Sequence, residues 1–314
     1  MHFHEDPAEC AGCPVRDAHG QDWPVTLRLE HAGRIYGALS VCLPGHMQAA
    51  IASYPELGNT DMTLQPRCHW GISQHILNPQ QSTVDFVQGV LEELLALFPG
   101  RFVHVGGDEA LKVEWSESRP AQERMRELDL SSEAEMQSWF IREMVSFLQE
   151  RGRRLIGWDE ILEGGLAPGA AVMSWRGEKG GIEAARAGHD VVMAPNQCTY
   201  FDHYQTAPTE DEPLAIGGLT TVDEVYAYEP VPEALSEEEA LHVLGSQGQL
   251  WTEYIPDRAK LDYMAYPRAC ALAEVLWCSQ KCRNSADFFR RLEHHFRRLR
   301  GLGVQAGPLR GKRG

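Results

Sequence analysis

The 314-residue sequence has no apolar run that approaches the roughly 18 residues needed to cross a bilayer. Its first residues also lack a basic region followed by an apolar one, the pattern of a secretory signal peptide. We therefore expect neither a membrane anchor nor a signal in this chain, and no membrane partner.

Basic residues are scarce. The chain has 29 Lys and Arg against 45 Asp and Glu, a formal net charge of −16. This excess disfavours nucleic acid and anionic membrane surfaces as partners. The main basic cluster, residues 290–300, places arginines at helical spacing around apolar residues, which predicts a solvated helix face.

The cysteine pattern of this chain is not the disulfide framework of a small secreted domain. Eight are spread over the whole chain, whereas small secreted domains concentrate theirs at close spacings. Cys270 and Cys278 lie in helical surroundings. The cysteine usage favours a reducing compartment, with a mild preference for the cytoplasm.

From about residue 83, segments with helical periodicity alternate with short apolar strands, an order typical of a parallel sheet. The predicted helices cover about 84–98, 133–150, 180–187, 258–277 and 285–300, the second beginning at Ser131 or Ser132. With a strand ending near Leu43, the predicted strands number six, and the other five lie at 102–105, 154–157, 171–174, 190–194 and 243–250.

Each of the last five strands is followed by an aromatic or acidic side chain. These side chains are Asp108 and Glu109, Trp158, Trp175, Tyr200 and Asp202, then Trp251 and Glu253. In a (β/α)8 barrel the active site is built at the carboxyl ends of the strands, and packing alone has no reason to prefer them. Aromatic walls with carboxylates between them suit a carbohydrate, which has apolar ring faces and a hydroxyl rim.

Asp108 and Glu109 follow two glycines. Neighbouring side chains on a regular strand point to opposite faces, so these carboxylates can serve one site only if the strand has ended. Gly106 and Gly107 allow such a turn. The alternative is an ordinary solvated loop tip.

A glycosidase commonly uses two carboxyl groups on opposite sides of the bond that is cleaved. Adjacent residues, with Cα atoms about 3.8 Å apart, must instead approach the sugar from one side. A substrate-assisted mechanism fits this arrangement, because the oxygen of a 2-acetamido group then attacks the anomeric carbon. Glu109 would be the general acid and later the general base, while Asp108 would orient the acetamido N–H and stabilise the oxazolinium ion.

The motif His-Val-Gly-Gly-Asp-Glu at 104–109 resembles the signature of glycoside hydrolase family 20, the β-N-acetylhexosaminidases. Further matching motifs follow in family order between about 43 and 300: Pro-Gly-His at 44–46, Tyr-Pro-Glu-Leu-Gly at 54–58, Gly-Trp-Asp-Glu at 157–160, Ser-Trp-Arg-Gly at 174–177, Tyr-Phe-Asp at 200–202 and Leu-Trp-Thr-Glu at 250–253. One such motif would be weak evidence, whereas this many in order are specific.

The resemblance implies a role for each matching residue. Trp158, Trp175 and Trp251 would wall the acetamido pocket, and Tyr200 would donate a hydrogen bond to the acetamido oxygen. Asp202 and Glu253 would bind the O4 and O6 hydroxyls of the terminal sugar. His46 would support the catalytic Glu109. No metal or organic cofactor is implied, and the implied partner is an oligosaccharide or glycoconjugate ending in N-acetylhexosamine.

The N-terminal part departs from the family pattern. The family's first barrel strand carries an Arg that binds O3 and O4 of the sugar, but Arg16, Arg28 and Arg34 lie in no matching motif, and Ser40 and Cys42 stand where acidic residues are usual. We therefore expect a (β/α)8 TIM barrel in which strands 3 to 8 are recognisable and strands 1 and 2 are not.

Three readings of the N-terminal segment stay open. His2, His4, Cys10 and Cys13 could form a zinc set. Alternatively, the His-Phe-His start is a remnant of the second-strand motif. The preferred hypothesis is a truncated or out-of-frame translation, which the upstream DNA would test. The expected organisation is an atypical segment 1–35, a barrel domain 36–304 and a basic tail 305–314.

The sequence thus predicts an exo-glycosidase that removes terminal β-linked N-acetylglucosamine or N-acetylgalactosamine with retention. The alternative is an inactive barrel remnant with at most weak sugar binding, since the strand with the sugar-binding Arg is missing. A chitinase-type enzyme ranks lower, because its acidic residues alternate along a strand and are not adjacent.

Overall fold

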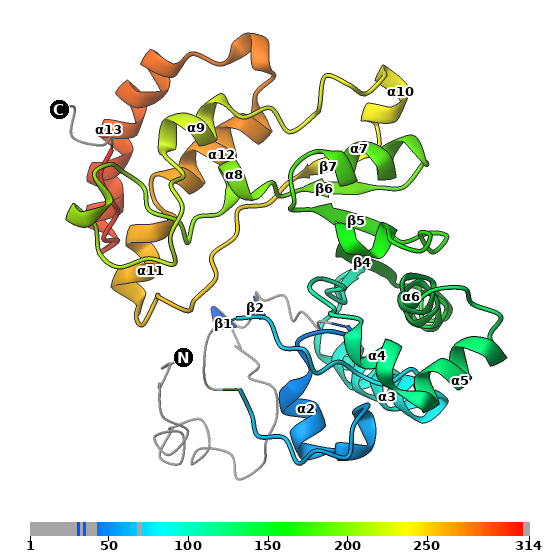
Figure 1. Cartoon of the computed structure of the whole chain (residues 1–314). Coiled ribbons are helices and arrows are strands. Elements are labelled where there is room, and N and C mark those ends of the chain that lie inside the picture. Colours follow the sequence, from blue (N-terminus) through cyan, green and yellow to red (C-terminus); the bar gives the residue numbers. More distant parts are fainter. Residues whose placement is uncertain (1–29, 32–33, 36–42, 68–70, 310–314) are drawn as a thin grey trace. The chain divides into compact units, whose positions relative to one another are not determined.

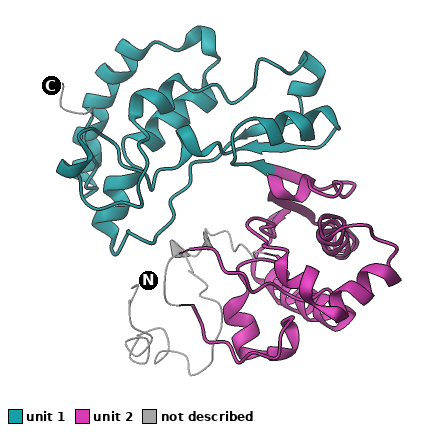
Figure 2. Cartoon of the chain, in the orientation of Figure 1, with its two compact units in different colours: residues 1–2, 173–314 teal, residues 3–172 magenta. Residues whose placement is uncertain are grey.

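The computed structural model describes residues 30–31, 34–35, 43–67 and 71–309 (Figure 1). By its contacts the chain divides into two compact units, one of residues 3–172 and one of residues 1–2 and 173–314 (Figure 2). The four residues of the possible zinc set lie outside the described residues. So do Arg16, Arg28, Ser40 and Cys42. The boundaries at residues 35 and 304 stay predictions.

The unit of residues 3–172 carries the first two strands of the parallel sheet and the helices around them. Its elements are β1 (Glu30–His31), β2 (Arg34–Ile35), α2 (Gln48–Ser53), η2 (Pro55–Leu57), α3 (Gln81–Leu97), β3 (Phe102–His104), α4 (Val113–Glu117), α5 (Arg119–Glu127), α6 (Glu133–Glu150), β4 (Arg154–Trp158) and η3 (Asp159–Leu162). β1 and β2 pair antiparallel, and β3 pairs parallel with β4, with Val103 opposite Leu155.

Helix α6 illustrates how the sequence specifies the elements of this unit. Ser132 is its N-cap, since the Ser132 side chain accepts a hydrogen bond from the amide of Glu135, which resolves the alternative between Ser131 and Ser132. Ten residues of α6 are buried, among them Phe140, Met144 and Leu148. The apolar face of the helix therefore forms part of the core that supports β3 and β4.

The other unit carries the remaining strands and the C-terminal helices. β5 (Ala171–Ser174) crosses the boundary and is followed by α7 (Lys179–Arg186), β6 (Val191–Met193), α8 (Asn196–Thr199), η4 (Thr209–Asp211), α9 (Val222–Ala227), α10 (Glu237–Ala240), β7 (Val243–Ser246), α11 (Arg258–Ala265), α12 (Arg268–Trp277), η5 (Gln280–Cys282) and α13 (Ser285–Gly301). β6 pairs parallel with β7.

The parallel strands follow one another in the order β3-β4-β5-β6-β7. This confirms an α/β fold with a parallel sheet, and within the described residues that order is open rather than closed. The predicted strand that ends near Leu43 falls mostly outside the described residues. Its last residue, Leu43, donates its amide hydrogen to the carbonyl of Val105 just beyond β3, at 2.7 Å.

The largest differences from the predicted elements lie in the C-terminal part of the chain. The strand predicted at 243–250 ends at Ser246, and the helical stretch at 258–277 is divided into α11 and α12 around Pro267. Proline cannot donate a backbone hydrogen bond and disfavours a helical residue before it, which explains the break.

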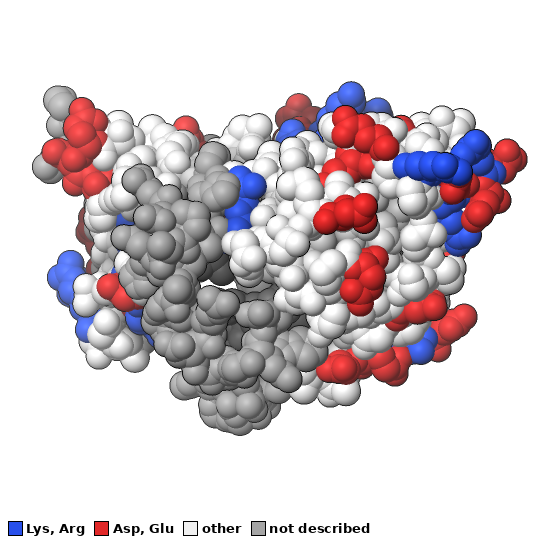
Figure 3. All heavy atoms as spheres, turned by 60° about the horizontal axis from the view of Figure 1, so that its bottom comes forward, with Lys and Arg blue, Asp and Glu red and all other residues white. Residues whose placement is uncertain are grey.

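Charged side chains of both signs lie on the surface, and acidic and basic residues occur close together on the face in Figure 3. The arginines of α13 lie among acidic partners as well, since Arg290 and Arg291 both pair with Asp287. The opposite face of α13 buries the apolar side chains of Phe288, Leu292, Phe296 and Leu299, as its helical spacing predicts. Among the described residues, no helix is long and apolar enough to cross a membrane.

Candidate active site

The predicted site residues fall into two groups, each described within its own unit. His46, Asp108, Glu109 and Trp158 belong to residues 3–172, and Trp175, Tyr200, Asp202, Trp251 and Glu253 belong to residues 173–314.

The chain turns sharply between β3 and the two carboxylates. Gly106 and Gly107 have φ angles of +74° and +98°, and Glu109 has a φ of +50°, all in the region that side chains rarely adopt. The buried side chain of Gln137 from α6 donates a hydrogen bond to the carbonyl of Gly107 at 2.7 Å. The strand has thus ended before the acidic pair, as the sequence analysis required.

The segment carrying His46 packs closely against this turn. A Cβ on Gly45 would lie 2.9 Å from the carbonyl oxygen of Asp108, so only glycine allows the two backbones to approach so closely. The Leu43 amide donates a hydrogen bond to the Val105 carbonyl, and the Leu77 amide donates one to the Pro44 carbonyl. These bonds hold the Pro-Gly-His motif beside the end of β3.

This packing places His46 against both carboxylates. Its Nε2 atom lies 3.4 Å from Oδ2 of Asp108 and 3.2 Å from Oε2 of Glu109. Hydrogen bonds to Asp108 and, to a smaller extent, to Glu109 raise the pKa of His46 to about 10, although burial of the ring opposes this rise. At neutral pH His46 is therefore an imidazolium whose proton lies between the two acids.

The same atoms bear on metal binding. Ligand atoms of His46, Asp108 and Glu109 lie within 4.8 Å of one another, close enough to surround a cation. A cation there would have to displace the proton that His46 holds up to a pH of about 10. This donor set is suited to sharing a proton.

His104 and Trp158 form the base of this group. His104 is the last residue of β3, and its Nδ1 atom accepts a hydrogen bond from the amide of Gly106 at 3.0 Å. Burial lowers the pKa of His104 to about 4, so its ring is neutral. The ring meets that of Trp158 edge to face, with centroids 4.9 Å apart. Trp158 is the last residue of β4 instead of following it.

In the other unit, Trp175 and Tyr200 lie side by side. Their rings are stacked with centroids 6.4 Å apart, and the ring of His203 lies 5.7 Å from that of Tyr200 on a tilted plane. Tyr200 also forms an isolated parallel bridge with Gln249. The bridge extends the β6 to β7 pairing and holds Tyr200 at the carboxyl end of the sheet.

Asp202 and Glu253 supply the carboxylates of this group. Asp202 is 4% exposed, and burial raises its pKa to about 7. A backbone hydrogen bond opposes this rise, the Glu253 carboxylate adds to it, and the Arg268 guanidinium lowers it. Asp202 thus changes charge near neutral pH, unlike an ordinary exposed aspartate.

Trp251 and Glu253 do not directly follow a strand, because β7 ends at Ser246. They lie in the loop that leads to α11, where Trp251 is 37% exposed. An aromatic side chain this exposed can offer its face to a ligand.

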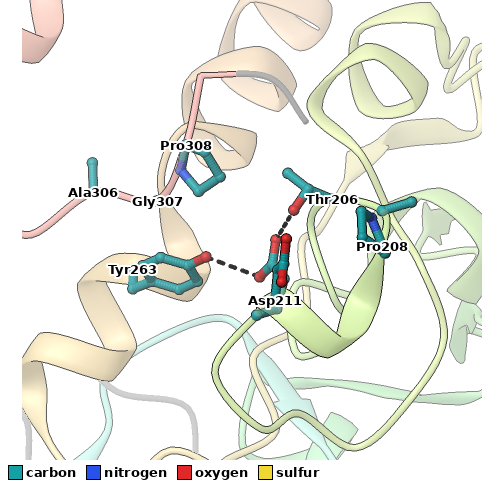
Figure 4. A pocket seen from close by; sticks show the side chains of 9 residues that line it. Thr206, Pro208, Asp211, Tyr263, Ala306, Gly307 and Pro308 are labelled. Carbon is teal, nitrogen blue, oxygen red and sulfur yellow. Dashed lines mark hydrogen bonds between the residues drawn. The ribbon is translucent and has the colours of Figure 1, made fainter. Parts of the chain in front are cut away.

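A hollow of about 360 Å³ lies elsewhere in residues 173–314 and contains none of the predicted site residues (Figure 4). It is lined by Thr206, Ala207, Pro208, Asp211, Glu212, Tyr263, Ala306, Gly307 and Pro308. The Glu212 carboxylate there accepts hydrogen bonds from the hydroxyls of Tyr263 and Thr206. Because its own chain satisfies this carboxylate, the hollow is a less suitable binding site than the strand ends.

Three residues contribute to these groups without having been predicted from the sequence. Gln137 fixes the turn at Gly107, His104 supports Trp158, and Arg268 holds the backbone around Asp202. The signal for His104 was its place within the motif at 104–109. Gln137 and Arg268 gave no comparable signal, since each lies on a helix far along the chain from its partner.

Comparison with known proteins identifies the family. Residues 39–280 match the catalytic domain of glycosyl hydrolase family 20. The chain belongs to this family. A beta-hexosaminidase of Porphyromonas gingivalis is 47% identical over 264 residues, and one of Vibrio furnissii is 35% identical over 236 residues.

Solved family 20 structures share the fold. The exo β-N-acetylglucosaminidase from Vibrio harveyi, in complex with N-acetylglucosamine, matches 86% of this chain with a TM-score of 0.75 and 32% identity. The β-N-acetylhexosaminidase from Streptomyces coelicolor matches 86% with a TM-score of 0.72 and 27% identity. These family 20 enzymes are TIM barrels, which confirms the predicted fold class.

The matches extend over only part of the relatives. The chain spans 34% and 38% of the length of the Porphyromonas and Vibrio furnissii proteins, and 43% of the Vibrio harveyi chain. Their activity is therefore carried to this chain only as a proposal.

Proposed function

We propose that this family 20 chain is an exo-acting β-N-acetylhexosaminidase. It removes a terminal β-linked N-acetylglucosamine or N-acetylgalactosamine, with the acetamido group of the substrate as nucleophile. Two relatives are named beta-hexosaminidase, and the Vibrio harveyi neighbour was solved with N-acetylglucosamine bound.

One observation carries the proposal. Among the described residues, three buried carboxylate oxygens lack a hydrogen-bond partner: Oδ1 of Asp108, Oδ1 of Asp202 and Oε2 of Glu253. A buried acceptor without a donor is costly, and native proteins keep few of them unless a ligand supplies the donor. All three belong to the residues that the sequence assigned to sugar binding or catalysis, and a sugar offers N–H and O–H donors.

The roles of the first group follow from its geometry. Oδ2 of Asp108 faces His46, which leaves the unpartnered Oδ1 to accept the acetamido N–H. This orients the acetamido oxygen to attack the anomeric carbon and stabilises the positive charge of the oxazolinium ion. Glu109, with His46 as its proton partner at 3.2 Å, protonates the leaving oxygen and then deprotonates the attacking water.

The second group binds the rest of the sugar. We assign Trp175 and Trp251 of this group, with Trp158 of the first group, to the walls around the acetamido methyl group. The Tyr200 hydroxyl is assigned to a hydrogen bond with the acetamido oxygen. Asp202 and Glu253 accept hydrogen bonds from the sugar hydroxyls O4 and O6. Their unpartnered oxygens have the acceptor character that these contacts need.

Glu109→Gln tests the assignment of the acid. The amide cannot donate a full proton, so kcat on an aryl N-acetyl-β-glucosaminide should fall by roughly 10² to 10⁴. The loss should be greater for a less acidic phenol, which leaves poorly without protonation. Glu117→Gln, on an exposed position of α4 in the same unit, is the matched control and should retain full activity.

The nucleophile is tested with a fluorinated substrate. Replacing the acetamido group by trifluoroacetamido withdraws electrons from the attacking oxygen, so kcat should fall steeply with each fluorine. A rate that ignores fluorination would mean that a protein carboxylate attacks. No turnover by soluble, folded wild-type protein would favour the inactive remnant.

A further inference from the structure

Arg268 is a fully buried cation at the start of α12, 0% exposed. Such a charge is normally kept only where it is paired or fully hydrogen-bonded. The five N–H bonds of its guanidinium all have backbone carbonyl acceptors: Met264, Phe201, His203 and Thr220, with Met264 accepting two. The group therefore organises backbone and, among the described residues, makes no ion pair with a carboxylate.

Two of these carbonyls belong to the residues before and after Asp202, Phe201 and His203. Nη2 donates to the carbonyl of Phe201 at 2.5 Å, and Nη1 donates to that of His203 at 2.9 Å. The guanidinium also lies over the Phe201 ring, 5.2 Å from its centroid. The peptide unit just before Asp202 and the one just after His203 are thus held by one rigid, planar group.

The same contacts reach Tyr200. Nη1 of Arg268 also donates to the carbonyl of Thr220, whose hydroxyl lies 3.0 Å from Nδ1 of His203. The His203 ring in turn lies against Tyr200. One side chain therefore supports the two residues of this turn that the proposed function assigns to the substrate.

We propose that Arg268 is a positioning residue for substrate recognition: its guanidinium clamps the backbone on both sides of Asp202 and so aligns the Asp202 carboxylate and the Tyr200 ring with the sugar. This inference rests on the proposed function for the identity of the ligand. It adds a residue that touches no substrate, located on a helix distant in sequence from the turn.

Arg268→Lys and Arg268→Met test the clamp. Lys keeps the charge but offers at most three donors in no planar array, and Met keeps the apolar stem without charge or donors. Arg283→Lys is the matched control, because the Arg283 side chain is only 6% exposed, lies in the same unit and donates to the carbonyl of Tyr228, with Glu229 as its ion-pair partner. Melting curves first establish which variants are folded.

The kinetic arm is a double-mutant cycle with Asp202→Asn. In the wild-type background, Arg268→Lys should lower kcat/KM for the aryl N-acetyl-β-glucosaminide roughly 10- to 100-fold, mainly by raising KM. A loss of this size corresponds to one charged hydrogen bond. In the Asp202→Asn background the same change should lower kcat/KM less than about threefold, because the contact between the Asp202 carboxylate and the sugar is already lost. Equal losses in both backgrounds would overturn the proposal.

Hydrogen exchange gives a readout that does not need activity. The amides of residues 201–204 should exchange faster in both Arg268 variants than in Arg283→Lys, while those of α13 stay unchanged. If the wild type hydrolyses nothing, the proposed function fails but the exchange result still decides the clamp. Unchanged exchange at 201–204 in a folded variant would refute it.

Discussion

At the scale of single residues, the site combines charges that the surroundings keep away from their ordinary protonation states. His46 holds its proton to a pH of about 10 through its two carboxylate neighbours, whereas burial keeps His104 neutral. The raised pKa of Asp202, about 7, places its carboxyl group between the protonated and the ionised form at neutral pH. Such opposed shifts are characteristic of functional sites, where proton transfer and polar recognition need specific charge states.

Asp202→Asn is expected to stabilise the protein above neutral pH. The pKa of Asp202 rises from 3.8 to about 7 on folding, so the native state favours the protonated acid. Its stabilising contribution is complete below about pH 4 and is lost as the pH rises through 7. Asn, always neutral, should remove this loss, which is on the order of a few kcal/mol at pH 8.

Melting temperatures from pH 4 to pH 9 measure this effect. The gain should grow through pH 7, and Glu233→Gln, an exposed carboxylate in the same unit, should show none. A gain that is equal at all pH values would contradict the assignment. Substrate affinity should fall in the same variant, since the amide accepts hydrogen bonds more weakly than a carboxylate.

At the scale of elements, the turn after β3 decides where the acidic pair Asp108 and Glu109 lies. Gly107 combines a positive φ with a close contact, because a Cβ there would lie 2.5 Å from Cγ2 of Ile161 in η3. The glycines of this motif are therefore structural requirements of the turn as well as family markers.

Gly107→Ala should destabilise the protein by about 2 to 4 kcal/mol, the sum of backbone strain and overpacking. Gly152→Ala separates the two effects, since Gly152 has a φ of +68° but no atom within 4 Å of an added Cβ. We expect it to cost roughly 1 kcal/mol. Urea denaturation of both variants provides the measurement, and equal costs would exclude the contact with Ile161.

The strand and helix boundaries show where local pattern suffices. α6 and β5 have the predicted residues, because a full amphipathic period and a short apolar run are both complete within those segments. The strand β7 was predicted too long. The regular hydrogen-bonded ladder ends at Ser246, although the strand pattern of the sequence continues over residues 247–250. Ladder length depends on the partner strand, which the local sequence does not contain.

At the scale of the whole molecule, charge limits the range of partners. The net charge of −16 and the mixed surface in Figure 3 argue against binding a polyanion. We expect no binding to a labelled DNA duplex at about 0.15 M salt, where electrostatic contacts are already weakened. Fluorescence anisotropy at protein concentrations up to about 10⁻⁴ M, the weak end of the usual range for non-specific binding, would reveal an error.

The sequence by itself determined the family, the alternating α/β order and the identity of the candidate residues, because these depend on short contiguous motifs. Their roles remain proposals, and the N-terminal assignments fall outside the described residues. Only the tertiary structure decided that His46 lies against both Asp108 and Glu109, that Gln137 holds Gly107, and that Arg268 bonds the backbone carbonyls of the residues before and after Asp202. The physical reason is that hydrogen bonds and burial act between side chains brought together by folding, and no local pattern encodes such distant partners.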